Sequence, residues 1–582
     1  MNSFMSTFFK IKFIAFLFFI PFISHAFCES GFESSISQFG ITWTFDKEYR
    51  CGQFANGDYW VLGPLTINEI TPAYDFDFPT NSDQCVYPSI ETCTSYPGSE
   101  YGITCPNVLG QDYCVYKKAK NGWMVNPSDV SKQGFDASVS SFDESTVPNL
   151  PYVASPNESI VKSVSYPNGS RPILKSLAVL TVLGEIPANN GLDFFRPPYF
   201  GIDKAIISIN DIDWDLLPAY APSVAPPPIE NFRAVTYFMG PQLDYLSNHL
   251  IDYLHPDDNM PNDGGALATR NGEIALRLML DDSPESKKSL AIDYIQHGID
   301  LYYAGINGAK WPPDGQIYIG RKLPMTFAAV MLDNQDMKNF VSGGDDFQFQ
   351  ENGVFHHTIQ SGQSLWSMNK STYANEWRYW DELVRTPDYG GKTGPDPYGY
   401  IDGSSVPGVT YLMSGNSMQS KKFSLALLLM PTLRPVWNDQ EILDFTQRWV
   451  SHGVWTQPDP CAPVTGICKA GTVNAGANCT MAGSYLCNHT EYSVNFGYTK
   501  MYDCDYLARE SEDRGVKYGE DPDNPGHCIS DNDPTDGIGR VPFAHGLFAN
   551  SGQGISAWTE ALWVDYGGLI ENPINPTGLN VL

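Results

Sequence analysis

The stretch LPAYAPSVAPPPIE, residues 217–230, separates two parts of the chain that differ in hydrophobic period. Its five prolines predict an extended, semi-rigid linker. Before it, apolar and polar residues alternate in short segments, which predicts strands. After it, apolar residues recur every three or four positions, which predicts helices. The linker therefore indicates a boundary between a β-rich part and a helical part.

Three segments carry the strand prediction. Residues 41–45 (ITWTF) alternate, and Asn56-Gly57 is a hairpin signal between two apolar runs. Residues 171–187 (RPILKSLAVLTVLGEIP) contain a continuous apolar run that is typical of a buried strand. We expect a β-rich, sandwich-like N-terminal domain.

Helical spacing appears repeatedly after the linker. Ser283-Pro284-Glu285 is an N-cap signature for one helix, whose apolar face includes Leu290, Tyr294, His297 and Leu301. The other predicted helices cover residues 241–254, 265–281, 324–333, 420–430, 439–451 and 555–566. Helices joined by long polar loops favour an (α/α) toroid, a ring of helical hairpins around a cleft.

The predicted fold class is multidomain α+β. The expected order is a signal peptide (1–26), a β-rich disulfide-stapled domain (27–216), the linker (217–230), a toroid-like helical domain (231–460), a disulfide-rich insertion (461–540) and a closing helix (541–582).

The N-terminus has the pattern of a signal peptide. Lys10 and Lys12 precede the apolar run 13–23, and Ser24-His25-Ala26 supplies small residues for cleavage after Ala26. The run is too short for a membrane span. The prediction is a secreted or periplasmic protein with no membrane span.

The twelve cysteines form two clusters of six. An oxidising compartment predicts three disulfides in each cluster, and spacing does not choose the pairing. The cysteines are Cys28, Cys51, Cys85, Cys93, Cys105, Cys114, Cys461, Cys468, Cys479, Cys487, Cys504 and Cys528.

Composition restricts the possible partners. The 582 residues include 36 basic and 66 acidic side chains, a formal net charge of −30, which argues against a nucleic-acid partner. HExxH, P-loop and GxSxG motifs are absent, which argues against zincin, nucleotide-dependent and α/β-hydrolase chemistry. A polysaccharide or oligosaccharide partner suits the high aromatic content.

Two adjacent cations mark the first candidate site. Arg321 and Lys322 precede Pro324, which is expected at the first position of a helix, where cations are disfavoured. They either form salt bridges with carboxylates such as Asp314 or bind a uronate carboxylate or sulfate. Trp311 nearby either stacks on sugar rings or belongs to the core.

Histidines and a carboxylate are further candidates. His297 lies on an apolar helix face, where a structural role is the more common one, whereas His255 lies in a predicted loop. Glu376 is surrounded by Tyr373, Trp377 and other aromatic residues, which would raise its pKa and suit a general acid, unless it pairs with a neighbouring arginine.

Two acidic stretches, 257–263 and 531–537, resemble calcium loops without having EF-hand spacing. A structural calcium ion is thus possible, with solvated turns as the alternative. No other metal or cofactor is expected.

Six segments together resemble a group of large secreted bacterial proteins, mostly of unassigned activity. They are FANGDYWVLGPLTI (54–67), the apolar strand around 177–183, FRPPYFG (195–201), QHGIDLY (296–302), GRKLPMTFAAVML (320–332) and NEW (375–377). The resemblance implies a β-rich N-terminal part and a helical domain like that of polysaccharide lyases. It implies as shared positions Gln296, His297, Asp300, Arg321, Lys322, Glu376 and Trp377. The cysteine-rich segment 461–540 departs from the group.

The leading functional prediction is a polysaccharide lyase that cleaves a uronic-acid polymer by β-elimination. Arg321 and Lys322 would neutralise the uronate, and His297, Tyr302 or His255 would be the base. Glu376 completes the catalytic candidates, and the substrate-binding candidates are His255, Trp311, Asp314, Tyr373 and Trp377.

Two alternatives remain. One is a glycoside hydrolase with paired carboxylates, Glu376 and Asp314. The other is a glycan-binding surface protein without activity. Because the acidic chain repels acidic polymers, the lyase prediction needs Arg321 and Lys322 to form a local positive region. Otherwise a neutral substrate and a hydrolase are favoured.

Overall fold

The computed structural model describes part of the chain. The described residues are 28, 31–77, 94–95, 103–104, 118–139, 141–166, 173–234, 240–246, 264–312, 318–345, 347–353, 357–358, 364–365, 417–452, 472–475, 478–481, 518–520, 528–530 and 556–566. The predicted signal peptide and both predicted calcium loops lie outside them.

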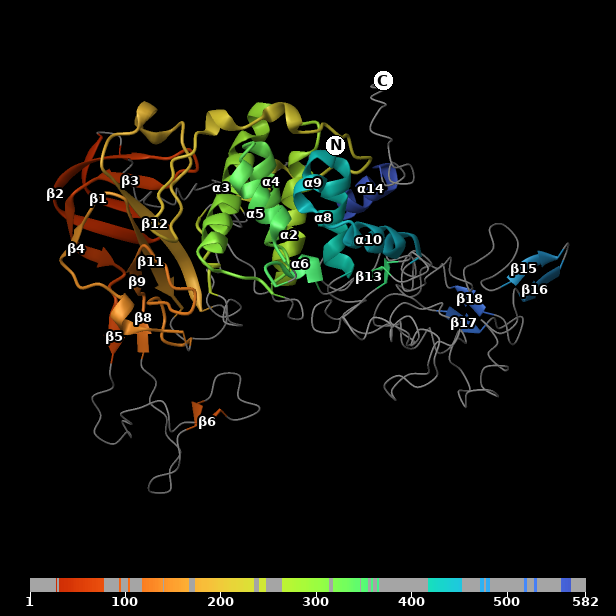
Figure 1. The fold of residues 1–582 in the computed structure, drawn as a ribbon, viewed down its shortest axis with the longest axis horizontal. Coiled ribbons are helices and arrows are strands. Elements are labelled where there is room, and N and C mark those ends of the chain that lie inside the picture. The colour runs from red at the N-terminus through yellow and green to blue at the C-terminus, as the bar shows by residue number, and fades with distance from the viewer. Residues whose placement is uncertain are drawn as a thin grey trace, which may run out of the picture.

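The N-terminal part is one curled sheet rather than two stacked sheets (Figure 1). Its order is β10-β4-β2-β3-β12-β11-β9, with β1 also paired to β2. All pairs are antiparallel except β3 with β12. The strands are β1 (Phe32–Gln38), β2 (Ile41–Gln53), β3 (Tyr59–Leu62), β4 (Leu65–Thr71), β9 (Trp123–Val125), β10 (Tyr152–Ala154), β11 (Glu158–Ser165) and β12 (Leu174–Leu183).

Strand β2 explains the curl. It is 13 residues long and pairs with β4 through its first half, with β3 through its last three residues, and with β1 in both halves. The sheet therefore folds around Trp43, Ile67, Ile160 and Leu180, which share one buried cluster. The Asn56-Gly57 hairpin and the buried strand expected within 171–187 are both present. The sandwich-like arrangement is not, because the strands form one curled sheet that runs from β10 to β9.

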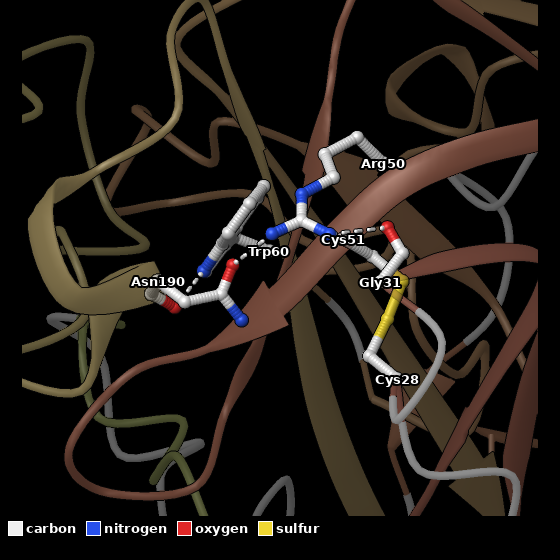
Figure 2. Close-up of a disulfide and its surroundings, with 6 residues drawn as sticks. All are labelled: Cys28, Gly31, Arg50, Cys51, Trp60 and Asn190. Carbon is white, nitrogen blue, oxygen red and sulfur yellow. Dashed lines mark hydrogen bonds between the residues drawn. A yellow bond between two sulfur atoms is a disulfide. The ribbon is translucent and has the colours of Figure 1, made fainter.

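A disulfide joins the start of this part to the sheet. Cys28 bonds to Cys51 on β2, with their Cα atoms 6.0 Å apart. Beside it, Arg50 Nη1 donates to Gly31 O (3.2 Å) and Nη2 donates to Asn190 Oδ1 (3.1 Å) (Figure 2). The side chains of the other ten cysteines lie outside the described residues.

Short two-stranded sheets make up the remaining strands. They are β5 (Asp75–Asp77) with β8 (Lys118–Lys120), β6 (Thr94–Ser95) with β7 (Ile103–Thr104), β13 (His357–Thr358) with β14 (Ser364–Leu365), β15 (Thr472–Ala475) with β16 (Asn478–Met481), and β17 (Tyr518–Glu520) with β18 (Cys528–Ser530).

Helices pack beside the curled sheet (Figure 1). They are α1 (Ile229–Ala234), α2 (Gly264–Leu278), α3 (Pro284–Ile306), α4 (Lys322–Met331), α5 (Gln335–Gly343), α6 (Gln350–Gly353), α8 (Ser417–Leu429), α9 (Arg434–Trp437), α10 (Glu441–His452) and α14 (Ala557–Tyr566). The fold is thus an α+β mixture. Within the described residues, no helix is long and apolar enough to cross a membrane.

Helix α3 begins as the sequence predicts. The Ser283 hydroxyl accepts from Ser286 N (3.2 Å), and Pro284 is the first helical residue. At Gly298 this helix packs very closely on α4, because an added Cβ would lie 2.3 Å from Pro324 O. Glycine at this position therefore lets the two helices approach.

The prediction of a helix over residues 241–254 is wrong for its first half. Residues 241–246 are non-helical and buried, and 247–254 lie outside the described residues. Tyr199 Oη donates to Gln242 O (2.8 Å), and Tyr245 Oη donates to Lys132 O (2.9 Å). These tertiary contacts hold the backbone in a non-helical conformation despite its helical periodicity.

One hydrophobic cluster joins the sheet to the helices. It contains Val161 and Leu177 from the sheet together with Tyr294, Phe327 and Leu425 from the helices. The proline-rich segment is bonded to the helical part along its length. Tyr220 N donates to Met279 O (2.9 Å), Ser223 N to Asp565 Oδ2 (2.7 Å) and Tyr566 Oη to Ala221 O (2.8 Å).

Candidate functional site

Helix α4 begins two residues earlier than predicted, so Arg321 is its N-cap and Lys322 its first residue. A buried carboxylate lies at this end: Glu351 Oε1 accepts from Gly320 N (2.8 Å) and Lys322 N (3.3 Å). Burial raises the pKa of Glu351, while these backbone donors and Lys322 oppose the rise. The two cations are tolerated at a helix start because a carboxylate lies there with them.

Arg321 is bound to a second carboxylate. Its Nε lies 2.7 Å from Asp244 Oδ2, its Nη2 lies 3.2 Å from Asp244 Oδ1, and both side chains are 1% exposed. Its Nη1 donates to Ile319 O (3.1 Å). Of the two options left open by the sequence, the structure shows a salt bridge, formed with Asp244.

Lys322 is enclosed by aromatic rings. Its Nζ lies 4.5 Å from the centroid of Trp437 and 5.7 Å from that of Phe349, and it donates to Asn352 Oδ1. The residue is 1% exposed. This environment holds the ammonium group by cation–π contact and a hydrogen bond.

His297 lies close to Arg321, within reach of its charge. Burial and Arg321 together lower the pKa of His297 to about 3, and the residue is 5% exposed. Its imidazole is therefore neutral at physiological pH. We refer to His297, Arg321, Lys322, Glu351 and Asp244 as the α4-end cluster.

The remaining described candidates lie in the core. Tyr302 is 8% exposed and packs edge-on against Phe340, with centroids 5.6 Å apart. Burial raises the pKa of Tyr302. Trp311 is fully buried and stacks on Phe349 at 6.1 Å. His255, Asp314, Tyr373, Glu376 and Trp377 lie outside the described residues, so their roles stay predictions.

Four of the segments that carry the resemblance meet between sheet and helices. Arg196 Nε lies 2.6 Å from Asp58 Oδ2, and its Nη2 binds Asp300 Oδ2 on α3. Gln296 Nε2 donates to Arg196 O (3.1 Å). Burial raises the pKa of Asp300 to about 6, and Arg196 opposes this rise. This ion-pair triad joins the β2–β3 turn to α3, which in turn packs on α4.

A second cluster of charges lies where α2, α8 and α14 meet, and the sequence analysis does not predict it. Lys422 on α8 places its Nζ 2.7 Å from Glu273 Oε1 on α2. The two helices are close here, since a Cβ on Gly272 would lie 2.5 Å from Lys422 Cβ. Ser556, just before α14, donates from its Oγ to the same Glu273 oxygen (2.8 Å).

Lys421 and Glu560 complete this cluster. Lys421 is 2% exposed, and burial lowers its pKa to about 7, with Glu560 opposing the change. Glu560, in the first turn of α14, is partly exposed. Burial raises the pKa of Glu560 to about 7 against the effect of Lys421 and Lys422. We call Glu273, Lys421, Lys422, Ser556 and Glu560 the α8–α14 cluster.

The α8–α14 cluster contains two carboxyl groups in different environments. Carboxylates in different environments are a recurring feature of glycosidase sites. Glu560 titrates near neutral pH, whereas Glu273 is held by an ammonium and a hydroxyl group. A sequence signal was available, because Lys421-Lys422 directly precede the apolar run 423–430 and Glu560 lies within the apolar stretch 557–564.

No metal site accompanies either cluster: the described ranges contain no group of three or more His, Cys, Asp or Glu side chains arranged to hold an ion. Comparison with family models, with curated proteins and with solved structures finds no match. The resemblance stated from the sequence therefore stays a prediction.

Proposed function

We propose that the chain is a secreted carbohydrate-active enzyme and that it hydrolyses glycosidic bonds at the α8–α14 cluster. The observation that carries this proposal is Glu560, a partly exposed carboxyl group with a pKa of about 7 that interacts with Lys422. Lys422 also binds a second carboxylate, Glu273. Glycoside hydrolysis needs one protonated and one ionised carboxyl group.

The two carboxyl groups take different roles. Glu560 donates its proton to the glycosidic oxygen as the bond to the anomeric carbon breaks. Glu273 takes a proton from the water whose oxygen attacks that carbon. Lys422 and Ser556 both bind Glu273 Oε1, which orients the base. Protons and oxygen atoms balance, because one water is consumed.

The proposal includes the (α/α) toroid arrangement for the helical part. In that arrangement α2, α8 and α14 line one side of a central cleft. Their mutual packing around the α8–α14 cluster supports this arrangement, and an experimental structure of the helical part would test it.

β-Elimination at the α4-end cluster is the second candidate. The favouring observation is that three predicted catalytic residues, His297, Arg321 and Lys322, come together there, with His297 neutral and able to accept a proton. It ranks second because Arg321 is 1% exposed and already bound to Asp244.

Product analysis separates the candidates. The purified full chain is incubated with a panel of plant, fungal and bacterial polysaccharides. New reducing ends without ultraviolet absorbance are the expected result, and they indicate hydrolysis. Ultraviolet-absorbing unsaturated ends would indicate the lyase. Polymer binding with no product would indicate a glycan-binding protein and would overturn the hydrolase.

Substitution of the proton donor gives the sharper test. Glu560→Gln should lower kcat by about 10²–10⁴-fold, because the leaving oxygen loses its acid. Activity of the wild type should fall as the pH rises above about 7, where Glu560 ionises. Glu273→Gln should cause a similar loss through the base.

The matched control is Glu285→Gln, which also removes an acidic residue from the first turn of a helix, α3. It should retain full activity. If Glu560→Gln folds and keeps wild-type kcat, the proposed site is wrong.

A further inference from the structure

The cations of both clusters face an equal number of carboxylates. At the α4 end, Arg321 pairs with Asp244, and Lys322 shares the helix start with Glu351. At α8, Lys422 pairs with Glu273, and Lys421 lies opposite Glu560. Each adjacent cation pair is thus matched by two carboxylates.

This balance bears on the charge of the substrate. A uronate or sulfate group binds through cations that are not already neutralised. Arg321, Lys322, Lys421 and Lys422 are each at most 2% exposed. Neither cluster therefore offers the local positive region that a polyanion needs.

The net charge of the whole chain also disfavours an acidic substrate. A formal net charge of −30 repels acidic polymers at long range.

We infer that the substrate is an uncharged glycan and not a uronic-acid or sulfated polymer. This inference rests on the proposed hydrolase function and specifies its substrate class. It also replaces the uronate polymer that the sequence analysis favours.

A pair of polymers with related sugar rings tests the inference. The full chain is assayed for reducing ends on galactan and on polygalacturonate, and on other neutral and uronic-acid polymers. Neutral polymers should be cleaved, with a KM that changes by less than about twofold between about 20 and 200 mM NaCl, since screening does not affect an uncharged ligand. Cleavage of polygalacturonate at a higher kcat/KM than any neutral polymer would overturn the inference and leave the hydrolase proposal intact.

If no polymer is cleaved, the hydrolase proposal loses its support. Retardation of the protein in gels that contain the same polymers then still tests the inference about the ligand. Retardation only by neutral polymers would still support an uncharged ligand. Retardation by uronic-acid polymers, or by none of the panel, would reject it.

Discussion

The α4-end cluster and the α8–α14 cluster are built alike and differ in one respect. Both start from two adjacent cations at or near the beginning of a helix, and both match them with two carboxylates. At the α4 end every charged residue is at most 5% exposed. At α14, Glu560 keeps part of its surface in solvent and titrates near neutral pH.

This difference in exposure distinguishes a structural charge network from a candidate site. Ion pairs that are buried on all sides hold helices and strands in place, and removing one partner strongly lowers the free energy of unfolding. A network with one accessible, half-ionised member can exchange a proton with a ligand. The α4-end cluster fits the first description and the α8–α14 cluster fits the second.

The largest effect on stability is expected from breaking the sealed pair. Arg321→Met leaves the Asp244 carboxylate buried without its partner and should lower the free energy of unfolding by about 3–5 kcal/mol. Urea denaturation measures this loss. The double variant Arg321→Met/Asp244→Leu removes both charges and should recover much of it.

Activity per folded molecule should be unchanged in Arg321→Met. A variant that is folded and inactive would instead move catalysis to the α4 end and favour the lyase.

A smaller effect, opposite in sign, is expected at Lys421. Its pKa is about 7 in the folded protein and about 10.4 in an unfolded chain. The folded state therefore binds fewer protons, and the wild type loses stability as the pH falls from about 10.4 to about 7. Lys421→Met should be more stable than wild type at pH values near 6, by about 2–4 kcal/mol.

The advantage of Lys421→Met should shrink as the pH rises toward the unfolded pKa. Denaturation at several pH values measures it. An advantage that does not change with pH would show that Lys421 is charged in the folded state at all of them.

The smallest effect is expected from close packing at the α4 end. Gly320 has φ +105°, and a Cβ there would lie 2.6 Å from Ala268 Cα. Gly320→Ala should cost about 1–3 kcal/mol through backbone strain and the clash. Gly343→Ala is the control, because its Cβ meets nothing within 4 Å. Equal melting temperatures for the two variants would contradict the close packing.

Local signals in the sequence predict much of the fold. The Ser283 cap locates the start of α3, and the apolar run locates β12, because both depend on neighbouring residues. The helix expected at 241–254 does not form over residues 241–246, because tertiary contacts determine the backbone conformation there. Gln242 and Asp244 bind Tyr199 and Arg321, which are distant in sequence.

The candidate site is less predictable for the same reason. Convergence of His297 with Arg321 follows from helix packing that no local pattern encodes. Lys421 and Glu560 lie 139 positions apart, and neither has a motif around it. The sequence does show charged residues next to or within the apolar runs of predicted helices. A search for such charged residues would have found both Lys421 and Glu560.

The hydrogen bonds between the proline-rich segment and α14 have a consequence for biosynthesis. Ala221 and Ser223 are bonded to Tyr566 and Asp565, more than 340 positions later in the chain. A ribosome therefore releases Ala221 and Ser223 long before these partners exist. Because Glu560 belongs to the same late helix, a nascent chain that ends before α14 lacks the proposed acid, and the proposed activity would begin only after α14 is made.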